Sequence, residues 1–220
     1  LLMVNGLGEL DQTNTDAIMQ WLSANGALYW MYTVMRMIGR VAFPIFCFLL
    51  VEGFLHTHDV KKYAMRLGLF ALLSEIPFDL AFSSKILEFN YQNVFFTLFI
   101  GLLTMIAYRA VEEKEEWNQA LKVILYILIV AAGMALAYFL KTDYAEKGVF
   151  CIMVLYIFRK KKMWQIIAGC ASFIWETPAL FGFIPIAFYN GTRGWKMKYF
   201  FYIFYPAHIG LLYLLATTLA

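Results

Sequence analysis

"GRVAFPIFCFLLVEGFLHTHDVKKY", residues 39–63, is an apolar run with ionisable residues inside it and at its ends. Arg40, Glu52 and His56 lie within or beside its apolar centre. Ionisable groups are costly in a bilayer, so they face a bundle interior, pair with one another or serve a function. The stretch therefore predicts a membrane helix whose polar residues meet partners on neighbouring helices.

The whole chain has the composition of an integral membrane protein. Of its 220 residues 62% are hydrophobic and 15% charged, whereas soluble domains have roughly 45–50% and 25%. Apolar runs continue to the last residue, so a cleaved secretory signal does not explain them. We expect an all-α, polytopic transmembrane bundle of about seven or eight segments, some short or kinked, in a single integral membrane domain over 1–220.

Individual spans follow from the uncharged runs. Residues 91–108 and 123–140 are each 18 residues without a charge, close to the roughly 20 that cross a bilayer. Residues 27–55 and 59–82 are long enough but carry charges, and 59–82 is expected to face other helices rather than lipid. Residues 199–220 form a final apolar run.

The region 163–190 is apolar but interrupted by "WETP" at 175–178, where proline disfavours a continuous helix. Basic residues mark cytoplasmic loops. A single crossing here would place Arg193 and the lysines after it on the extracytoplasmic side of the membrane, against this rule. Two short segments forming a hairpin are therefore favoured. By the same alternation, residues 1–26 are extracytoplasmic and 27–220 form the bundle.

Ionisable residues in the first third of the chain recur at a spacing of four, which places both members of a pair on one helix face. The pairs are Arg36 with Arg40, Glu52 with His56, and Glu75 with Asp79. Two interpretations stay open: the groups pair with one another and hold the bundle together, or they line a cavity with a function.

Two histidines are candidate general bases, because imidazole titrates near neutral pH. His56 lies beside Glu52, and its alternative role is a solvated residue at a helix end. His208 follows Pro206, and its ring would alternatively satisfy a free backbone carbonyl. The separated histidines and carboxylates lack metal-ligand spacing, so no metal site is expected.

Two further motifs have a structural and a functional interpretation. Asn93 opens the span after an extracytoplasmic loop and suits a helix cap or a substrate contact. "YNGTRG" at 189–194 is a tight turn, or a set of amides that together with Arg193 binds a phosphate-bearing donor.

Several ordered blocks resemble the TraX-like membrane proteins, a family named for a conjugation protein that N-acetylates pilin. The blocks cover most of 38–214 and read "IGRVAFPIFCFLLVEGFLHTHDVKKY" (38–63), "RLGLFALLSEIPFDLAF" (66–82), "QNVFFTLFIGLL" (92–103), "DYAEKGV" (143–149), "YNGTRG" (189–194) and "KYFFYIFYPAHIGLLYL" (198–214). Family members carry an Asp-His pair in a first helix ahead of these blocks. This sequence holds no such pair, and "LLMVNG" at 1–6 resembles the tail of that helix, so either the helix lies upstream or this member has diverged. The first candidate for the catalytic histidine is upstream, followed by His208 and then His56.

The resemblance implies a polytopic acyltransferase that uses cytoplasmic acetyl-CoA as acyl donor. The candidate catalytic residues are His208, His56, Arg40, Glu52, Glu75 and Asp79. The candidate substrate-binding residues are Arg66, Asn93, Asp143, Tyr189, Asn190 and Arg193. Basic residues near Lys61, at 159–162 and at 193–198 would attract the phosphates of the donor.

We expect acetyl transfer to an amine or hydroxyl acceptor at or across the membrane, with a histidine as general base and the thioester arriving between the Arg40–His56 helix and the Glu75–Asp79 helix. The acceptor is a peptide N-terminus, a glycan or a lipid, and nucleic acid is not a partner. The expected location is a bacterial cytoplasmic membrane, crossed several times. The alternatives are a small transporter or flippase with a buried charged site, and a non-catalytic assembly subunit.

Overall fold

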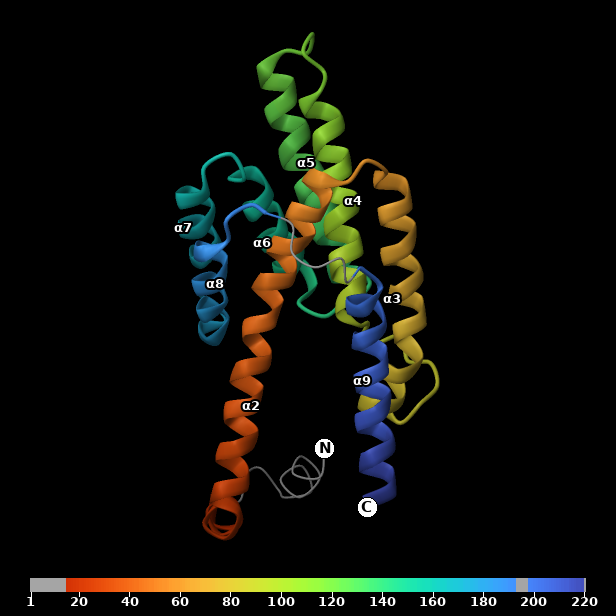
Figure 1. Ribbon diagram of the computed structural model, residues 1–220, viewed down its shortest axis with the longest axis vertical. Coiled ribbons are helices and arrows are strands. Elements are labelled where there is room, and N and C mark those ends of the chain that lie inside the picture. Colours follow the sequence, from red (N-terminus) through yellow and green to blue (C-terminus); the bar gives the residue numbers. More distant parts are fainter. Residues whose placement is uncertain (1–14, 193–197, 220) are drawn as a thin grey trace.

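The computed structural model describes residues 15–192 and 198–219, which form eight α-helices and one 3₁₀ helix joined by loops (Figure 1). The elements are α2 (Thr15–His56), α3 (Val60–Ser83), α4 (Val94–Glu112), α5 (Gln119–Phe139), α6 (Ala145–Ile157), α7 (Lys162–Ser172), η1 (Thr177–Gly182), α8 (Phe183–Phe188) and α9 (Lys198–Leu219). The all-α class predicted from the sequence is confirmed for this part of the chain.

Three of the described helices are long and apolar enough to cross a membrane: Ser23–His56 within α2, Val94–Glu112 and Gln119–Phe139. The last two confirm the spans predicted at 91–108 and 123–140. Shorter apolar stretches at Thr177–Phe188 and Tyr199–Leu215 add to them. The chain is therefore a multi-pass membrane protein by composition and helix length, and a total of seven or eight segments stays a prediction.

The centre of the bundle is α6. It packs against α2, α4, α5 and α7, and its Val149, Cys151, Ile152, Met153 and Leu155 are fully buried. With 13 residues it is about 20 Å long at 1.5 Å per residue. It is too short to cross a hydrocarbon core of about 30 Å alone, and it serves as the buried core of the bundle.

Helix α3 has two different faces, and the expectation that 59–82 faces other helices holds for one of them. Its polar Ser74, Glu75 and Asp79 are buried, whereas apolar side chains on the other face are exposed. The exposed residues are Met65, Leu69, Leu72, Leu73, Ile76 and Phe82. The buried face also carries Leu67, Ala71 and Phe78. It packs against α4 and α9, and the exposed apolar residues lie on the other side of the helix.

The hairpin predicted for 163–190 is confirmed. Helix α7 ends at Ser172, the chain turns through Trp175 and Glu176, and η1 begins at Thr177. The indole of Trp175 donates to the carbonyl of Ser172 at 2.8 Å. Helix α8 then packs back against α7, so residues 189–192 return to the end of the bundle where α7 began (Figure 1).

Helices α2 and α3 each pack against α4, and α9 packs along α3. The donor path that the sequence placed between α2 and α3 is therefore bounded by α4. The loops at 57–59 and 158–161 lie toward one end of this bundle, and 113–118 lies farther out on the same side, at the tip of the α4–α5 pair (Figure 1). The loops at 84–93, 140–144 and 173–176 lie toward the other end (Figure 1). Since 159–162 is basic, the first end is called the basic end below.

Candidate functional site

A cavity of about 300 Å³ lies where α3, α9 and two loops meet. Its lining residues are Phe78, Ala81, Phe82, Tyr91, Asp143, Tyr205, His208, Ile209 and Leu212. Most of them are apolar or aromatic, and Asp143 and His208 are the ionisable ones. An apolar cavity with a few convergent polar groups is the usual form of a small-molecule site.

His208 has a defined orientation in this cavity. Its Nδ1 lies 2.9 Å from the backbone carbonyl oxygen of Phe204, and its ring stacks on the Phe204 ring at a centroid distance of 4.9 Å. A carbonyl only accepts, so in the neutral ring Nδ1 carries the proton and Nε2 keeps its lone pair. Pro206 frees the carbonyl of Tyr202, four residues earlier, rather than that of Phe204, so the bond is not explained by the proline.

Asp143 is the acidic residue of the cavity. Its Oδ1 accepts a hydrogen bond from the hydroxyl of Tyr91 at 2.6 Å. Burial raises the pKa of Asp143 above its usual value of 3.8, against the hydrogen bond from Tyr91 and the charge of Arg40, which lower it. Burial and the neighbouring carboxylate also raise the pKa of Tyr91, so its phenol remains a donor at neutral pH.

The loop that carries Asp143 is held in place by α2 and α4. The hydroxyl of Thr97 donates to the carbonyl of Asp143, and Tyr144 stacks on Phe43 at a centroid distance of 3.7 Å. Burial raises the pKa of Tyr144 to about 12. Tyr144 has a φ of 63°, a left-handed conformation that a bulky residue keeps only when tertiary contacts hold it.

Arg40 lies next to this loop rather than in the cavity lining. Its guanidinium is 3.1 Å from Oε2 of Glu176 and 5.8 Å from the ring centre of Tyr144. The charge of Arg40 also acts on Asp143. The structure therefore places Arg40 and Asp143 together, and ties both to the hairpin tip through Glu176.

Glu75 and Asp79 line the interior face of α3, beside the cavity. The side-chain amide of Asn93 donates to Oε2 of Glu75 and to the carbonyl of Ala71, and the Asn93 Oδ1 caps α4 by accepting from Phe95. Asn93 is thus the helix cap that the sequence suggested. The other oxygen of Glu75, Oε1, is buried without a hydrogen-bond partner among the described residues.

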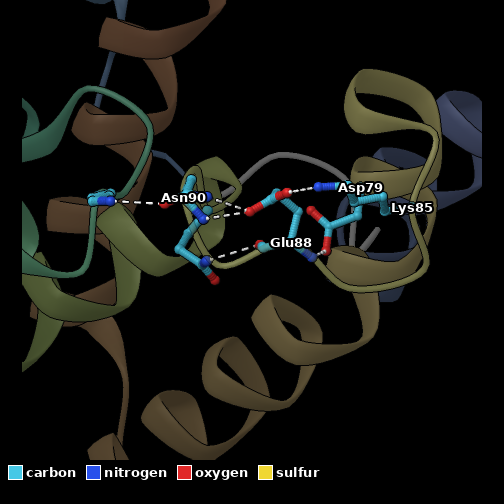
Figure 2. Close-up of polar contacts among 6 residues, drawn as sticks. Asp79, Lys85, Glu88 and Asn90 are labelled. Atoms are coloured by element: carbon cyan, nitrogen blue, oxygen red, sulfur yellow. Dashed lines mark hydrogen bonds and ion pairs between the residues drawn. The ribbon is translucent and has the colours of Figure 1, made fainter.

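Asp79 anchors the loop between α3 and α4. Its Oδ2 accepts from the backbone N–H of Glu88 at 2.7 Å. The carboxylate of Glu88 in turn accepts from Lys85 Nζ at 2.7 Å and from Asn90 Nδ2 at 2.6 Å (Figure 2). This loop carries Tyr91 into the cavity, so Asp79 contributes to the site by fixing the position of the loop.

Glu52, His56, Tyr189 and Asn190 lie at the basic end and not at the cavity. Along α2, His56 is 16 residues beyond Arg40, about 24 Å at 1.5 Å per residue. His56 Nδ1 lies 2.9 Å from the carbonyl oxygen of Glu52, and its side chain is 68% exposed. The carboxylate of Glu52 neighbours the hydroxyl of Tyr189. The residues that the sequence grouped as one site are therefore split between two ends.

Other predicted site residues are placed as follows. Asn190 Oδ1 accepts from the backbone N–H of Thr192 at 3.0 Å, which closes the tight turn. Arg66 neighbours the hydroxyl of Tyr202, and its buried Nε has no hydrogen-bond partner among the described residues. Arg193 lies outside the described residues.

Sequence reasoning missed Tyr91, Tyr205 and Glu176 as site residues. Tyr91 and Tyr205 are two of 14 tyrosines, and only the packing of α9 against α3 brings them together. Glu176 stands in the "WETP" break, an ionisable residue between apolar segments, and that signal could have identified it. Within 15–192 and 198–219, no group of three or more His, Cys, Asp or Glu side chains is placed to hold a metal ion.

Comparison with known proteins gives one family and one curated relative. The family described as "TraX protein" matches residues 16–216. The relative, "Probable fimbrial assembly protein FimC, serogroup H1" from Dichelobacter nodosus, is 28% identical over an alignment of 208 residues. The match covers 83% of this chain and 83% of the relative. No solved structure matches the chain.

Proposed function

We propose that this chain, which belongs to the TraX family, is a membrane acyltransferase that moves an acetyl group from acetyl-CoA to an amine or hydroxyl acceptor. The observation that carries the proposal is that His208 and Asp143 line the same cavity. The bond to Phe204 fixes the proton of His208 on Nδ1, which leaves Nε2 as the base.

In the proposed reaction, Nε2 of His208 takes a proton from the acceptor as its nitrogen or oxygen attacks the thioester carbonyl carbon. The carbon–sulfur bond then breaks, the acetyl group stays on the acceptor, and the CoA thiolate leaves with the proton from Nε2 of His208, which returns the imidazole to its neutral form. Asp143, held by Tyr91, stabilises the positive charge that develops on the imidazole or binds a protonated amine. Arg40 acts through Asp143 as a positioning residue.

In this proposal the phosphates of the donor are held at the basic end, and its acyl arm extends through the bundle to the cavity, which lies toward the other end. Exposed cations there, among them Lys61 and Lys160, favour the phosphates of acetyl-CoA. Glu52, His56 and Tyr189 belong to this end, so we assign them to donor binding rather than to proton transfer. The basic end faces the cytoplasm, where basic loops of membrane proteins collect.

The acceptor is proposed by its chemistry. The relative from Dichelobacter nodosus is named a fimbrial assembly protein, which favours a peptide amine over a glycan or a lipid hydroxyl. A negatively charged Asp143 beside His208 suits a protonated amine that must lose a proton before it attacks.

The test is acetyl-CoA turnover by the purified chain in nanodiscs, measured as thioester loss. His208→Ala should abolish turnover and leave saturable acetyl-CoA binding intact. His56→Ala should weaken acetyl-CoA binding with turnover kept at saturating donor. His58→Ala, an exposed loop residue, is the matched control and should match the parent chain. Turnover by His208→Ala equal to that of the parent would remove His208 as the base.

A transporter is the second candidate, favoured by the unpartnered Oε1 of buried Glu75. A carboxyl in this setting suits a proton relay. Glu75→Gln separates the two functions, because a relay needs an ionisable group and the transferase does not need one at this position. Full acetyl-CoA turnover by Glu75→Gln would support the transferase.

A further inference from the structure

The loop between α3 and α4, residues 84–93, presents large apolar side chains outward. Ile86 is 67% exposed, Leu87 58% and Phe89 77%. Scattered exposed hydrophobic residues are normal, but a cluster of three within four residues marks a surface that meets lipid or another apolar partner. The backbone here is irregular, so these residues are not simply the outer face of a spanning helix.

The polar side chains at positions 85, 88, 90 and 92 of the same loop are bonded within the protein. Glu88 is half-buried between its exposed neighbours, and it joins Lys85, Asn90 and Asp79 as Figure 2 shows. The carbonyl of Glu88 accepts from Gln92 Nε2 at 3.3 Å, and Lys141 Nζ donates to the side chain of Asn90 at 2.9 Å. These bonds lower the cost of placing the irregular segment at the membrane interface, where water satisfies the remaining backbone groups.

The neighbouring helices place lipid at the depth of this loop. Helix α9 packs along α3 and continues past the loop toward the C-terminus (Figure 1). Its Leu211, Leu212, Leu214 and Leu215 are 46–59% exposed. The exposed apolar face of α3 ends at Phe82, directly before the loop. The apolar surface of the loop is therefore continuous with surfaces that face lipid in a membrane protein.

We propose that loop 84–93 inserts into the interfacial region of the bilayer, on the side opposite the basic end. Ile86, Leu87 and Phe89 lie among the upper parts of the lipid chains, and Glu88 gathers the polar groups of the loop away from them. The partner of this surface is the bilayer itself. The inserted loop fixes the depth of the cavity, because Tyr91 in the loop and Phe82 just before it both line the cavity.

The test uses an environment-sensitive fluorophore on Phe89→Cys in the full chain, reconstituted in phosphatidylcholine vesicles. Cys47 and Cys151 are buried, so Cys170→Ala suffices as the background. The matched control is Glu115→Cys, an exposed position in the loop 113–118 at the basic end. Nitroxide on the upper acyl chain should quench the Phe89→Cys label. Iodide in the water should quench the Phe89→Cys label much less than it quenches the label on Glu115→Cys.

Iodide quenching of the Phe89→Cys label as strong as that of the control would overturn the insertion.

A second variant tests the role of Glu88. Adding Glu88→Ala should restore iodide quenching at Phe89→Cys, because Asn90 and Lys85 lose their acceptor and draw the loop toward water. Glu88→Gln retains an acceptor for Asn90 and should show a smaller change. Lipid quenching unchanged in Glu88→Ala would overturn the role assigned to Glu88.

Discussion

His208 and His56 make the same local hydrogen bond and differ in what surrounds them. Each ring places Nδ1 at 2.9 Å from the carbonyl oxygen four residues earlier, which leaves Nε2 with the lone pair in the neutral form. His56 points from the exposed end of α2, whereas His208 lines a cavity with Asp143. The cavity, not the hydrogen bond, distinguishes the candidate base.

The charge of Asp143 gives a pH-dependent prediction. Burial raises the pKa of this carboxyl in the folded protein, so the folded state binds a proton more tightly than the unfolded state. The stabilisation from this tighter proton binding is fully present below the pKa that Asp143 has in the unfolded state. It is lost as the pH rises through the pKa of Asp143 in the folded state. Asp143→Asn cannot ionise and should raise the thermal midpoint at pH 7.5 relative to the parent.

The measurement is thermal unfolding in detergent at pH 4.5 and 7.5. Asp143→Asn should reduce the difference between the two midpoints, and acetyl-CoA turnover should fall because the carboxylate is gone. Tyr91→Phe is the complementary variant: it removes the donor to Asp143 and should raise the pKa of Asp143 further. A midpoint for Asp143→Asn below that of the parent at pH 7.5 would contradict this assignment.

At the scale of elements, glycines allow α6 to approach its neighbours. A Cβ at Gly148 would lie 2.5 Å from Thr97 Cγ2 and 3.0 Å from Tyr144 Cβ, and one at Gly101 would lie 2.5 Å from Ile152 Cδ1. Small residues at such contacts bring backbones together in membrane proteins, where packing rather than water drives association. The short α6 thus reaches full burial between longer helices.

Gly148→Ala and Gly39→Ala form a matched pair. The first forces Thr97 or Tyr144 to move and should lower the free energy of unfolding by roughly 1–3 kcal/mol. The second has no atom within 4 Å of the new Cβ and should raise it by up to about 1 kcal/mol through helix propensity. Unfolding in mixed detergent micelles measures both. Equal effects of the same sign would refute the packing argument.

At the scale of the whole molecule, the fold makes a prediction about sidedness. The hairpin of α7 and α8 returns residues 189–192 to the basic end (Figure 1). In cells, Asn190→Cys should therefore share the accessibility of Glu115→Cys, and both should resist an impermeant thiol reagent added outside. Lys141→Cys, exposed in the loop 140–144, should react. Labelling of Asn190→Cys from outside would mean that 163–190 crosses the membrane once.

The sequence alone determined the membrane class, the two uncharged spans, the helix break at "WETP" and the TraX family, because each depends on composition, run length or a local motif. It also placed Glu75 and Asp79 on one helix face through their spacing. Only the tertiary structure decided which polar residues meet. It separated Glu52 and His56 from Arg40, although all three lie on one helix. It placed His208, Asp143 and Tyr91, from distant segments, in the lining of one cavity. Periodicity reports the face of a single helix, whereas a site forms from packing between helices whose partners no local pattern specifies.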